Sequence, residues 1–277
     1  MRIFIFIIAL MIAMPAMAQD KAKESAYDRV IRTGVLKVGY FVWPPYQIQD
    51  PNTGELSGFT IDYMKVIASL LDVKVEYVPM AALGTQVEEF SKGRIDVAAT
   101  DGPYVFTMLK FVDFSDPLFY APVYAYGRVG ESRFKTLQDL NAEGVTFVGL
   151  DGDLSADLVR RNYPKAKLTT LPVGTDPGQM MMNVQTSKAD AVIIDPGSVI
   201  TFNANNELDL SIIAPGTPVA MYPIGFSMAK DDGKLLTVMN GVVAALLNTN
   251  SMEPFVEKWF PESGTIYLPR RPYEANP

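Results

Sequence analysis

The chain has 277 residues, a formal charge of −7, and neither histidine nor cysteine. The absence of histidine excludes Ser/His nucleophilic sites and the usual imidazole zinc sites, and the absence of cysteine excludes disulfides and lipid attachment through a thiol. The acidic balance argues against nucleic acid as a partner, and a chain of this length with 48% hydrophobic residues can fill two cores of ordinary size.

Residues 1–18 have the pattern of a cleavable secretory signal peptide. Arg2 supplies a positive start, residues 3–13 are apolar, and residues 16–18 form the small-x-small sequence after which such peptides are cut. A membrane anchor would need about 18 or more apolar residues, whereas Pro15 interrupts this run. We therefore expect export to the periplasm, and no later apolar run reaches spanning length.

From Val35 onward, short β-branched runs alternate with helical stretches, a pattern typical of βαβ units. Residues 59–71 predict a helix because apolar side chains spaced at three or four fall on one face: Ile61, Met64, Ile67 and Leu71. Since predicted strands flank this helix in the sequence, its apolar face is expected to lie on a sheet.

A second series of strands and helices follows Arg128. Within it, residues 180–182 are consecutive methionines, which we interpret as gap-filling core rather than as a binding surface. Three prolines between residues 215 and 223 then break the rhythm. Beyond them, residues 234–248 predict a long helix that packs against the first lobe.

Several segments, in order and with consistent spacing, resemble those of a known family. They are VLKVGYFVWPPY, GELSGFTIDYMKVIASLL, GRIDVAATD, VDFSDPLFY, KADAVIIDPGSV, YPIGFSMAKDD and VEKWF, which together span roughly residues 36–260. In this series the chain resembles the type II periplasmic solute-binding proteins of polar amino-acid uptake systems, also called family 3. Each segment alone is a weak signal, whereas the collinear series is specific.

The resemblance implies an α/β, two-lobed, type II periplasmic binding protein-like fold, in which each lobe is a mixed sheet flanked by helices. The first lobe is interrupted by the second. We accordingly expect the signal peptide at residues 1–18, the first lobe at 19–126 and 221–277, and the second lobe at 127–220. Two crossing strands, near residues 122–129 and 218–227, are expected to form a hinge through which a ligand shifts the population between open and closed forms.

The resemblance also implies a periplasmic solute-binding component of an ABC-type uptake system, which binds a small molecule between its lobes and docks on an inner-membrane ABC permease. We expect a monomer that is not an enzyme and uses no cofactor or metal. Two alternatives stay open. One is a sensor or an accessory to a periplasmic dehydrogenase; the other is a dehydratase, because exported cyclohexadienyl dehydratases resemble the same family. Those enzymes are thought to use a carboxylate just after the family's cleft aspartate, where this chain has Pro196, Gly197 and Ser198.

Trp43 and Tyr46 occupy positions at which the family places aromatic rings against the ligand. Such rings bury much area and attract cations, at about 0.5–2 kcal/mol each. Trp43 is expected to face the ligand, whereas Tyr46 fits a ligand contact or a core position equally well. Asp195 aligns with the family aspartate that holds a ligand's α-ammonium, and Asp195-Pro196 is also a good helix cap and first-turn pair.

The departures from the family pattern concern the groups that hold a ligand carboxylate. Met108 stands where amino-acid binders carry the arginine that clamps this carboxylate, and Pro103 stands where they carry serine or threonine. Lys110 would be a substitute cation if the alignment of residues 102–111 shifts. Without such a shift, the carboxylate clamp is missing.

Acidic residues take several other positions of the expected cleft. Residues 151–154, with the sequence Asp-Gly-Asp-Leu, stand in place of the family's Gln-Gly-Ser/Thr-Ser/Thr turn, and Asp101 stands where a small hydroxyl is usual. Asp151 and Asp153 fit a solvated turn and helix cap equally well; Tyr104 is a further ligand-facing candidate. We expect a cleft short of positive charge and a small polar ligand that is neutral or cationic, such as an amine or a quaternary ammonium compound.

Overall fold

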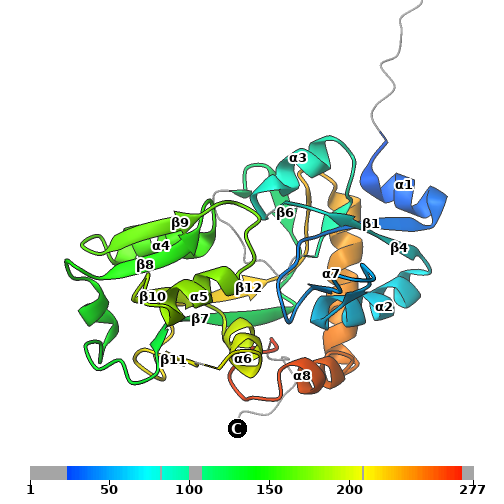
Figure 1. The fold of residues 1–277 in the computed structure, drawn as a ribbon. Helices are drawn as coiled ribbons and strands as arrows, with labels where there is room; N and C mark the ends of the chain where they lie inside the picture. The colour runs from blue at the N-terminus through cyan, green and yellow to red at the C-terminus, as the bar shows by residue number, and fades with distance from the viewer. Residues whose placement is uncertain (1–23, 82, 100–107, 208, 270–277) are drawn as a thin grey trace, which may run out of the picture.

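The computed structural model describes residues 24–81, 83–99, 108–207 and 209–269, which fold into two lobes, each with its own β-sheet (Figure 1). The predicted signal peptide lies outside these residues. Within them, no single helix is long and apolar enough to cross a membrane, and α7 (Gly233–Asn248) with α8 (Glu253–Trp259) meets that test only as a pair bent by 76°.

The first lobe is built on a five-stranded sheet in the order β4-β1-β5-β13-β6. Its strands are β1 (Val35–Tyr40), β4 (Lys74–Pro79), β5 (Val97–Ala98), β6 (Val112–Phe114) and β13 (Ser227–Ala229), with a separate hairpin of β2 (Ile48–Gln49) and β3 (Leu56–Ser57). Its helices, besides α7 and α8, are α1 (Ala26–Thr33), α2 (Phe59–Leu71), η1 (Leu83–Thr85) and α3 (Gln86–Ser91). Because β13 comes from the far end of the chain and pairs antiparallel with β5 and β6, both ends of the chain contribute to this lobe.

The second lobe is built on a sheet in the order β11-β7-β10-β8-β9, with β12 paired to β7. Its strands are β7 (Phe119–Arg128), β8 (Thr146–Leu150), β9 (Lys167–Leu171), β10 (Ala191–Ile194), β11 (Leu210–Ile212) and β12 (Ala220–Ile224). Its helices are η3 (Leu137–Leu140), α4 (Leu154–Asn162), α5 (Gly178–Gln185) and α6 (Pro196–Ala204). Strands β10, β8 and β9 are parallel neighbours, as expected for strands joined by crossover helices.

Two antiparallel strands, β7 and β12, carry the chain between the lobes (Figure 1). Along β7, Ala121 packs in the core of the first lobe, whereas Ala125 packs in the second. The strands lie at the two places where the resemblance implies a hinge. The mixed α/β architecture of two sheets flanked by helices is the expected fold class, and the precise lobe boundaries at 126/127 and 220/221 stay predictions.

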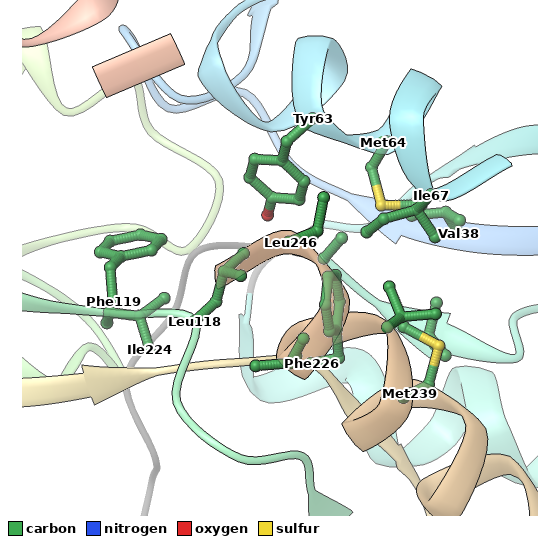
Figure 2. Close-up of a cluster of buried hydrophobic side chains, with 14 of the residues drawn as sticks. Val38, Tyr63, Met64, Ile67, Leu118, Phe119, Ile224, Phe226, Met239 and Leu246 are labelled. Atoms are coloured by element: carbon green, nitrogen blue, oxygen red, sulfur yellow. The ribbon is translucent and has the colours of Figure 1, made fainter. Parts of the chain in front are cut away.

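The first lobe contains the two helices that were predicted for it. Helix α2 covers residues 59–71, and its Ile61, Met64 and Ile67 are buried. Figure 2 shows Met64 and Ile67 beside Val38 of β1, with Met239 of α7 in the same cluster. The predicted helix 234–248 is α7, which packs on this lobe. The methionine run also lies in a core, since Met180 and Met181 are buried in the second lobe.

The chain beyond α8 stays on the protein as far as it is described. Thr265 and Ile266 are buried, and Tyr267 exchanges two backbone hydrogen bonds with Tyr120 of β7, at 2.7 and 2.8 Å. Residues 260–269 therefore pack across the first crossing strand.

Candidate ligand-binding cleft

A cavity of about 520 Å³ lies between the two lobes. The first lobe contributes the segment that follows β1, residues after β4, and Met108. The second lobe contributes the loop between β8 and α4, the first turn of α4, and the loop that follows β9. The volume of the cavity lies within the range of small-molecule sites, about 300–1,000 Å³.

The start of helix α2 holds the turn that carries Trp43. The first backbone N–H groups of a helix have no partner within it. Here those of Phe59 and Thr60 donate to the carbonyls of Pro45 and Tyr46, at 3.1 and 3.0 Å. Gly58 permits this approach, because its φ is 122° and a Cβ at this position would lie 2.3 Å from the Tyr46 carbonyl oxygen. The turn, and Trp43 with it, is thus tied to the rigid core of the first lobe.

The first-lobe wall of the cavity is apolar. Trp43 and Phe41 meet edge to face, with ring centroids 5.8 Å apart. Met108 lies on the same wall, and its sulfur accepts a hydrogen bond of 3.0 Å from the side-chain amide of the buried Gln86. Lys110 is exposed and is not among the residues that line the cavity. Two of the predicted site residues, Trp43 and Met108, are therefore brought to this wall.

The second-lobe wall is acidic. It carries Asp151 and Asp153, both predicted from the sequence, together with Asp157 and Asp176. Asp157 forms an exposed ion pair with Arg160 at 2.8 Å, and Asp176 accepts a 2.6 Å bond from the backbone N–H of Gly178. Among the described residues that line the cavity, none is a lysine or an arginine. The electrostatic potential in the cavity consequently favours positive charge.

Asp153 combines a structural and an electrostatic role. It is the N-cap of α4, and its carboxylate accepts a 2.7 Å hydrogen bond from the backbone N–H of Ser155. Burial raises the pKa of this carboxyl above its ordinary value, against the hydrogen bonds from Ser155 that lower it, and the charge of Asp157 raises it further. A positive charge in the cavity would relieve this cost of ionisation.

Asp195 is held by four donors of the protein itself. It ends β10 and caps α6, as the Asp-Pro pair predicted. One carboxylate oxygen accepts from the Ser198 backbone N–H at 2.9 Å and the Tyr46 hydroxyl at 3.2 Å. The other accepts from the Ser198 hydroxyl at 2.7 Å and from the Trp43 indole N–H at 3.2 Å; this single N–H is shared with the Ser198 hydroxyl oxygen, which lies 2.9 Å away. Since an ionised carboxylate has about four acceptor sites, these donors occupy most of the positions that a ligand ammonium would use.

The comparisons with known proteins agree with this architecture. The family model described as bacterial extracellular solute-binding proteins, family 3, matches residues 36–262. The chain belongs to this family.

The similar proteins include both a binding protein and an enzyme. The L-cystine-binding protein TcyJ of Escherichia coli is 25% identical, over 86% of this chain and 87% of the relative. The cyclohexadienyl dehydratase of Pseudomonas aeruginosa is 26% identical, over 66% of this chain and 68% of the relative. Among solved structures, the ancestral amino acid-binding protein AncCDT-1, a precursor of cyclohexadienyl dehydratase, is similar with a TM-score of 0.75 and 26% identity, over 85% of this chain and all of that one. The family supports a solute-binding role for this chain.

Two of the family 3 positions predicted as ligand contacts lie beside the cavity rather than on its wall. Tyr46 is 4% exposed, and its ring is parallel to that of Phe119 at 6.3 Å in the core of the first lobe. Asp195 is 8% exposed and is engaged as described above. Neither lines the cavity. Asp101 and Tyr104 lie outside the described residues. Ligand contact by each of the eight predicted residues stays a prediction.

Three residues of the site were missed from the sequence. Asp157 follows Asp153 by four positions on the same helix, a spacing that places both on one face. Asp176 precedes a proline just before α5, in the same Asp-Pro pattern as Asp195. Ser198 was noted only for lacking a carboxylate, whereas it supplies two of the four donors to Asp195. In the described part of the chain, no group of three or more acidic side chains is placed to hold a metal ion.

Proposed function

We propose that this protein is the periplasmic solute-binding component of an ABC-type uptake system and that it binds a small polar metabolite, neutral or cationic, in the interlobe cavity. In this proposal residues 1–18 are removed on export, the mature protein is a monomer, and its partner is an inner-membrane ABC permease. The solute-binding role follows from the family; the charge class of the ligand is the new part.

The observation that carries the charge class is the composition of the cavity walls. Four aspartates face an apolar wall, and the described lining residues include no cation. A ligand carboxylate brought into this space would meet four carboxylates, of which Asp157 is paired with Arg160. Two unit charges 4 Å apart interact by about 1 kcal/mol in water and about 4 kcal/mol at an effective dielectric constant near 20. A repulsion of this size, repeated over several aspartates, disfavours anionic ligands strongly.

Met108 supports the same conclusion from the opposite wall. In the family pattern its position belongs to the arginine that clamps a ligand α-carboxylate. Here a thioether contacts Gln86 instead, at 3.0 Å. A thioether offers surface and polarisability but no charge. Trp43, on the same wall, supplies an indole face that attracts amines and quaternary ammonium groups.

We propose a binding protein and not an enzyme, although a dehydratase is among the similar proteins. The position directly after Asp195, where the related dehydratases are expected to have a catalytic carboxylate, is Pro196, the first residue of α6. The aspartates of the cavity belong to caps and loops of one lobe. Facing them is an apolar wall with no second titratable group among its described residues to complete an acid–base pair.

A thermal-shift screen tests the proposal directly. The protein is heated with amines, betaines, amino acids and small organic acids, and isothermal titration follows each hit. A ligand at 100 times its Kd stabilises the protein by about 2.7 kcal/mol. We expect shifts with neutral or cationic compounds only, and a loss of affinity in Asp151→Asn. Asp209→Asn is the matched control, because Asp209 is exposed, lies away from the cavity lining and carries the same charge.

The other outcomes are equally informative. Tight binding of ordinary amino acids or organic acids would contradict the proposed charge class. The absence of any shift over the whole screen would favour a protein that uses the fold as a sensor or as an accessory to a periplasmic dehydrogenase.

A further inference from the structure

The contacts of Asp195 join the two lobes. Trp43 and Tyr46 belong to the turn after β1 in the first lobe, whereas in the second lobe Asp195 caps α6 and Ser198 lies in its first turn. The Ser198 hydroxyl makes a further crossing contact, since it lies 2.9 Å from the Trp43 indole nitrogen and 3.2 Å from the Pro44 carbonyl. We call these four side chains, Trp43, Tyr46, Asp195 and Ser198, the interlobe latch.

We propose that the interlobe latch holds the lobes together in the absence of ligand, with Asp195 as a positioning residue rather than as the group that binds a ligand ammonium. The donors from Trp43 and Tyr46 occupy acceptor sites that an ammonium would otherwise take. The role of a ligand cation at this carboxylate is thereby filled by two neutral N–H and O–H groups of the protein.

The packing around the latch supports a persistent contact. Trp43 packs against the cores of both lobes. Gly197, which precedes Ser198 on α6, lies so close to Phe260 of the first lobe that a Cβ would be 2.6 Å from the Phe260 ring. Phe260 is itself 4% exposed and meets Phe59 edge to face at 5.0 Å, so it cannot move aside freely. Hydrogen bonds and close packing therefore coincide at one edge of the cleft.

The charge of Asp195 explains why this contact is strong. Hydrogen bonds to an ionised group are roughly twice as strong as those between neutral groups. Opening the lobes would remove two donors from a carboxylate that is 8% exposed, and water would have to replace both. The two remaining donors from Ser198 stay with Asp195, because they belong to the same helix.

The latch also connects to the cavity through Trp43, whose indole N–H faces Asp195 while the residue lines the cavity wall. The latch thus fixes the aromatic surface that a ligand meets. A ligand then enters a cleft that is already joined at one edge, and its affinity is not reduced by a large open population.

A distance measurement without ligand tests this inference. The chain has no cysteine, so Lys92→Cys and Lys165→Cys, one on each lobe and both exposed, introduce the only two thiols for spin labels. Pulsed dipolar spectroscopy then measures the distance between the lobes. We expect one narrow, short distance in the labelled parent protein. With Trp43→Phe and Tyr46→Phe together, which keep an aromatic ring at each site, we expect the ratio of short to long distances to fall by at least about tenfold.

A matched control separates lobe closure from general destabilisation. Trp259→Phe removes an indole N–H that donates to the Asp62 carboxylate at 2.9 Å, within the first lobe only. It should leave the distance distribution unchanged. The single variants Trp43→Phe and Tyr46→Phe, with circular dichroism as a check on folding, serve if the double variant does not fold. Equal distributions in the parent and in these variants would overturn the inference. The experiment contains no ligand, so its failure would leave the proposed ligand class to be decided by the thermal-shift screen.

Discussion

The indole N–H of Trp43 lies 3.2 Å from a carboxylate oxygen of Asp195, and these two residues come from opposite lobes. The same tryptophan lines the interlobe cavity, whose other wall carries four aspartates. The environment of the Trp43 indole therefore depends both on lobe closure and on the charge of the cleft. Since the chain has only two tryptophans, this position can be observed by fluorescence.

In a Trp259→Phe variant, Trp43 becomes the single tryptophan, and collisional quenchers can probe the charge around it. We expect the Stern–Volmer constants of Trp43, each divided by the constant of the same quencher for free N-acetyltryptophanamide, to be larger for caesium than for iodide, because the acidic wall concentrates cations and repels anions. Added salt should reduce the difference, since it screens charges beyond about 10 Å at 0.1 M.

The matched variants for this measurement are Asp151→Asn and Asp209→Asn in the same background. The first removes a charge from the cavity wall and should lower the ratio of the caesium to the iodide constant; the second removes an exposed charge elsewhere and should not. A larger normalised constant for iodide than for caesium would show that the cleft is not acidic.

Gly197→Ala tests the close approach of the lobes by steric means alone. The added Cβ would lie 2.6 Å from the Phe260 ring, so we expect destabilisation of about 1–3 kcal/mol or a more open ligand-free form. Thermal unfolding and small-angle scattering measure the two effects.

Gly241→Ala is the control for this substitution. Gly241 lies in the middle of helix α7, and no atom would lie within 4 Å of its new Cβ. There we expect stabilisation, by about 0.5–1 kcal/mol, because alanine is the better helix residue. If both substitutions stabilise the protein equally and leave its dimensions unchanged, the contact between Gly197 and Phe260 is not tight in solution.

Much of the local structure could be predicted from the sequence, because the signals are local. Helix α2 covers the predicted residues, since apolar side chains at helical spacing suffice to define it. The caps at Asp153 and Asp195 follow from side chains that bond within three residues. The collinear order of the family-like segments was also sufficient to identify the family.

The residues that join the lobes could not be predicted in the same way. The sequence indicates that Asp195 is a carboxylate at a helix start, but the occupants of its acceptor sites depend on how the turn of Trp43 meets α6 across the cleft. For Tyr46 the sequence left two roles open, and both its buried ring and its hydroxyl at Asp195 depend on tertiary packing. Asp176 joins the acidic wall only because the loop after β9 folds toward α4.

Asp153→Asn should stabilise the protein at neutral pH. Burial raises the pKa of this carboxyl, so the folded state holds its proton more tightly than the unfolded state does. The tighter binding of the proton favours the folded state at low pH. This benefit is lost as the pH rises from the usual aspartate pKa, about 4, through the raised pKa of the folded state. Asparagine carries no charge and caps a helix as well as aspartate does. The melting temperature of the variant should exceed that of the parent at pH 7 and approach it below about pH 4.

Asp139→Asn is the control, because the pKa of this carboxyl is shifted in the opposite direction. Backbone hydrogen bonds from Thr136 and Lys135 lower the pKa of this exposed carboxyl. Its contribution to stability is present above the usual aspartate pKa and is lost as the pH falls through the lowered value, so the variant should melt below the parent at pH 7. A lower melting temperature for Asp153→Asn at pH 7 would mean that the interaction of the charged cap with helix α4 outweighs burial.

Met108→Arg places a positive charge on the apolar wall opposite the aspartates. We expect the compounds that stabilise the parent protein to lose at least about tenfold in affinity if they are cationic, because one added charge at 4 Å costs about 1 to 4 kcal/mol, depending on the effective dielectric constant. Met108→Leu is the matched variant, since it conserves the side-chain volume and removes only the contact with Gln86. Such a swap is expected to destabilise the protein by less than about 1.5 kcal/mol. Isothermal titration of each hit against the three proteins measures the effect. If the arginine variant bound cationic compounds as well as the leucine variant does, the ligand would not lie against Met108, and the position of the ligand in the cavity would have to be sought nearer the loop after β9.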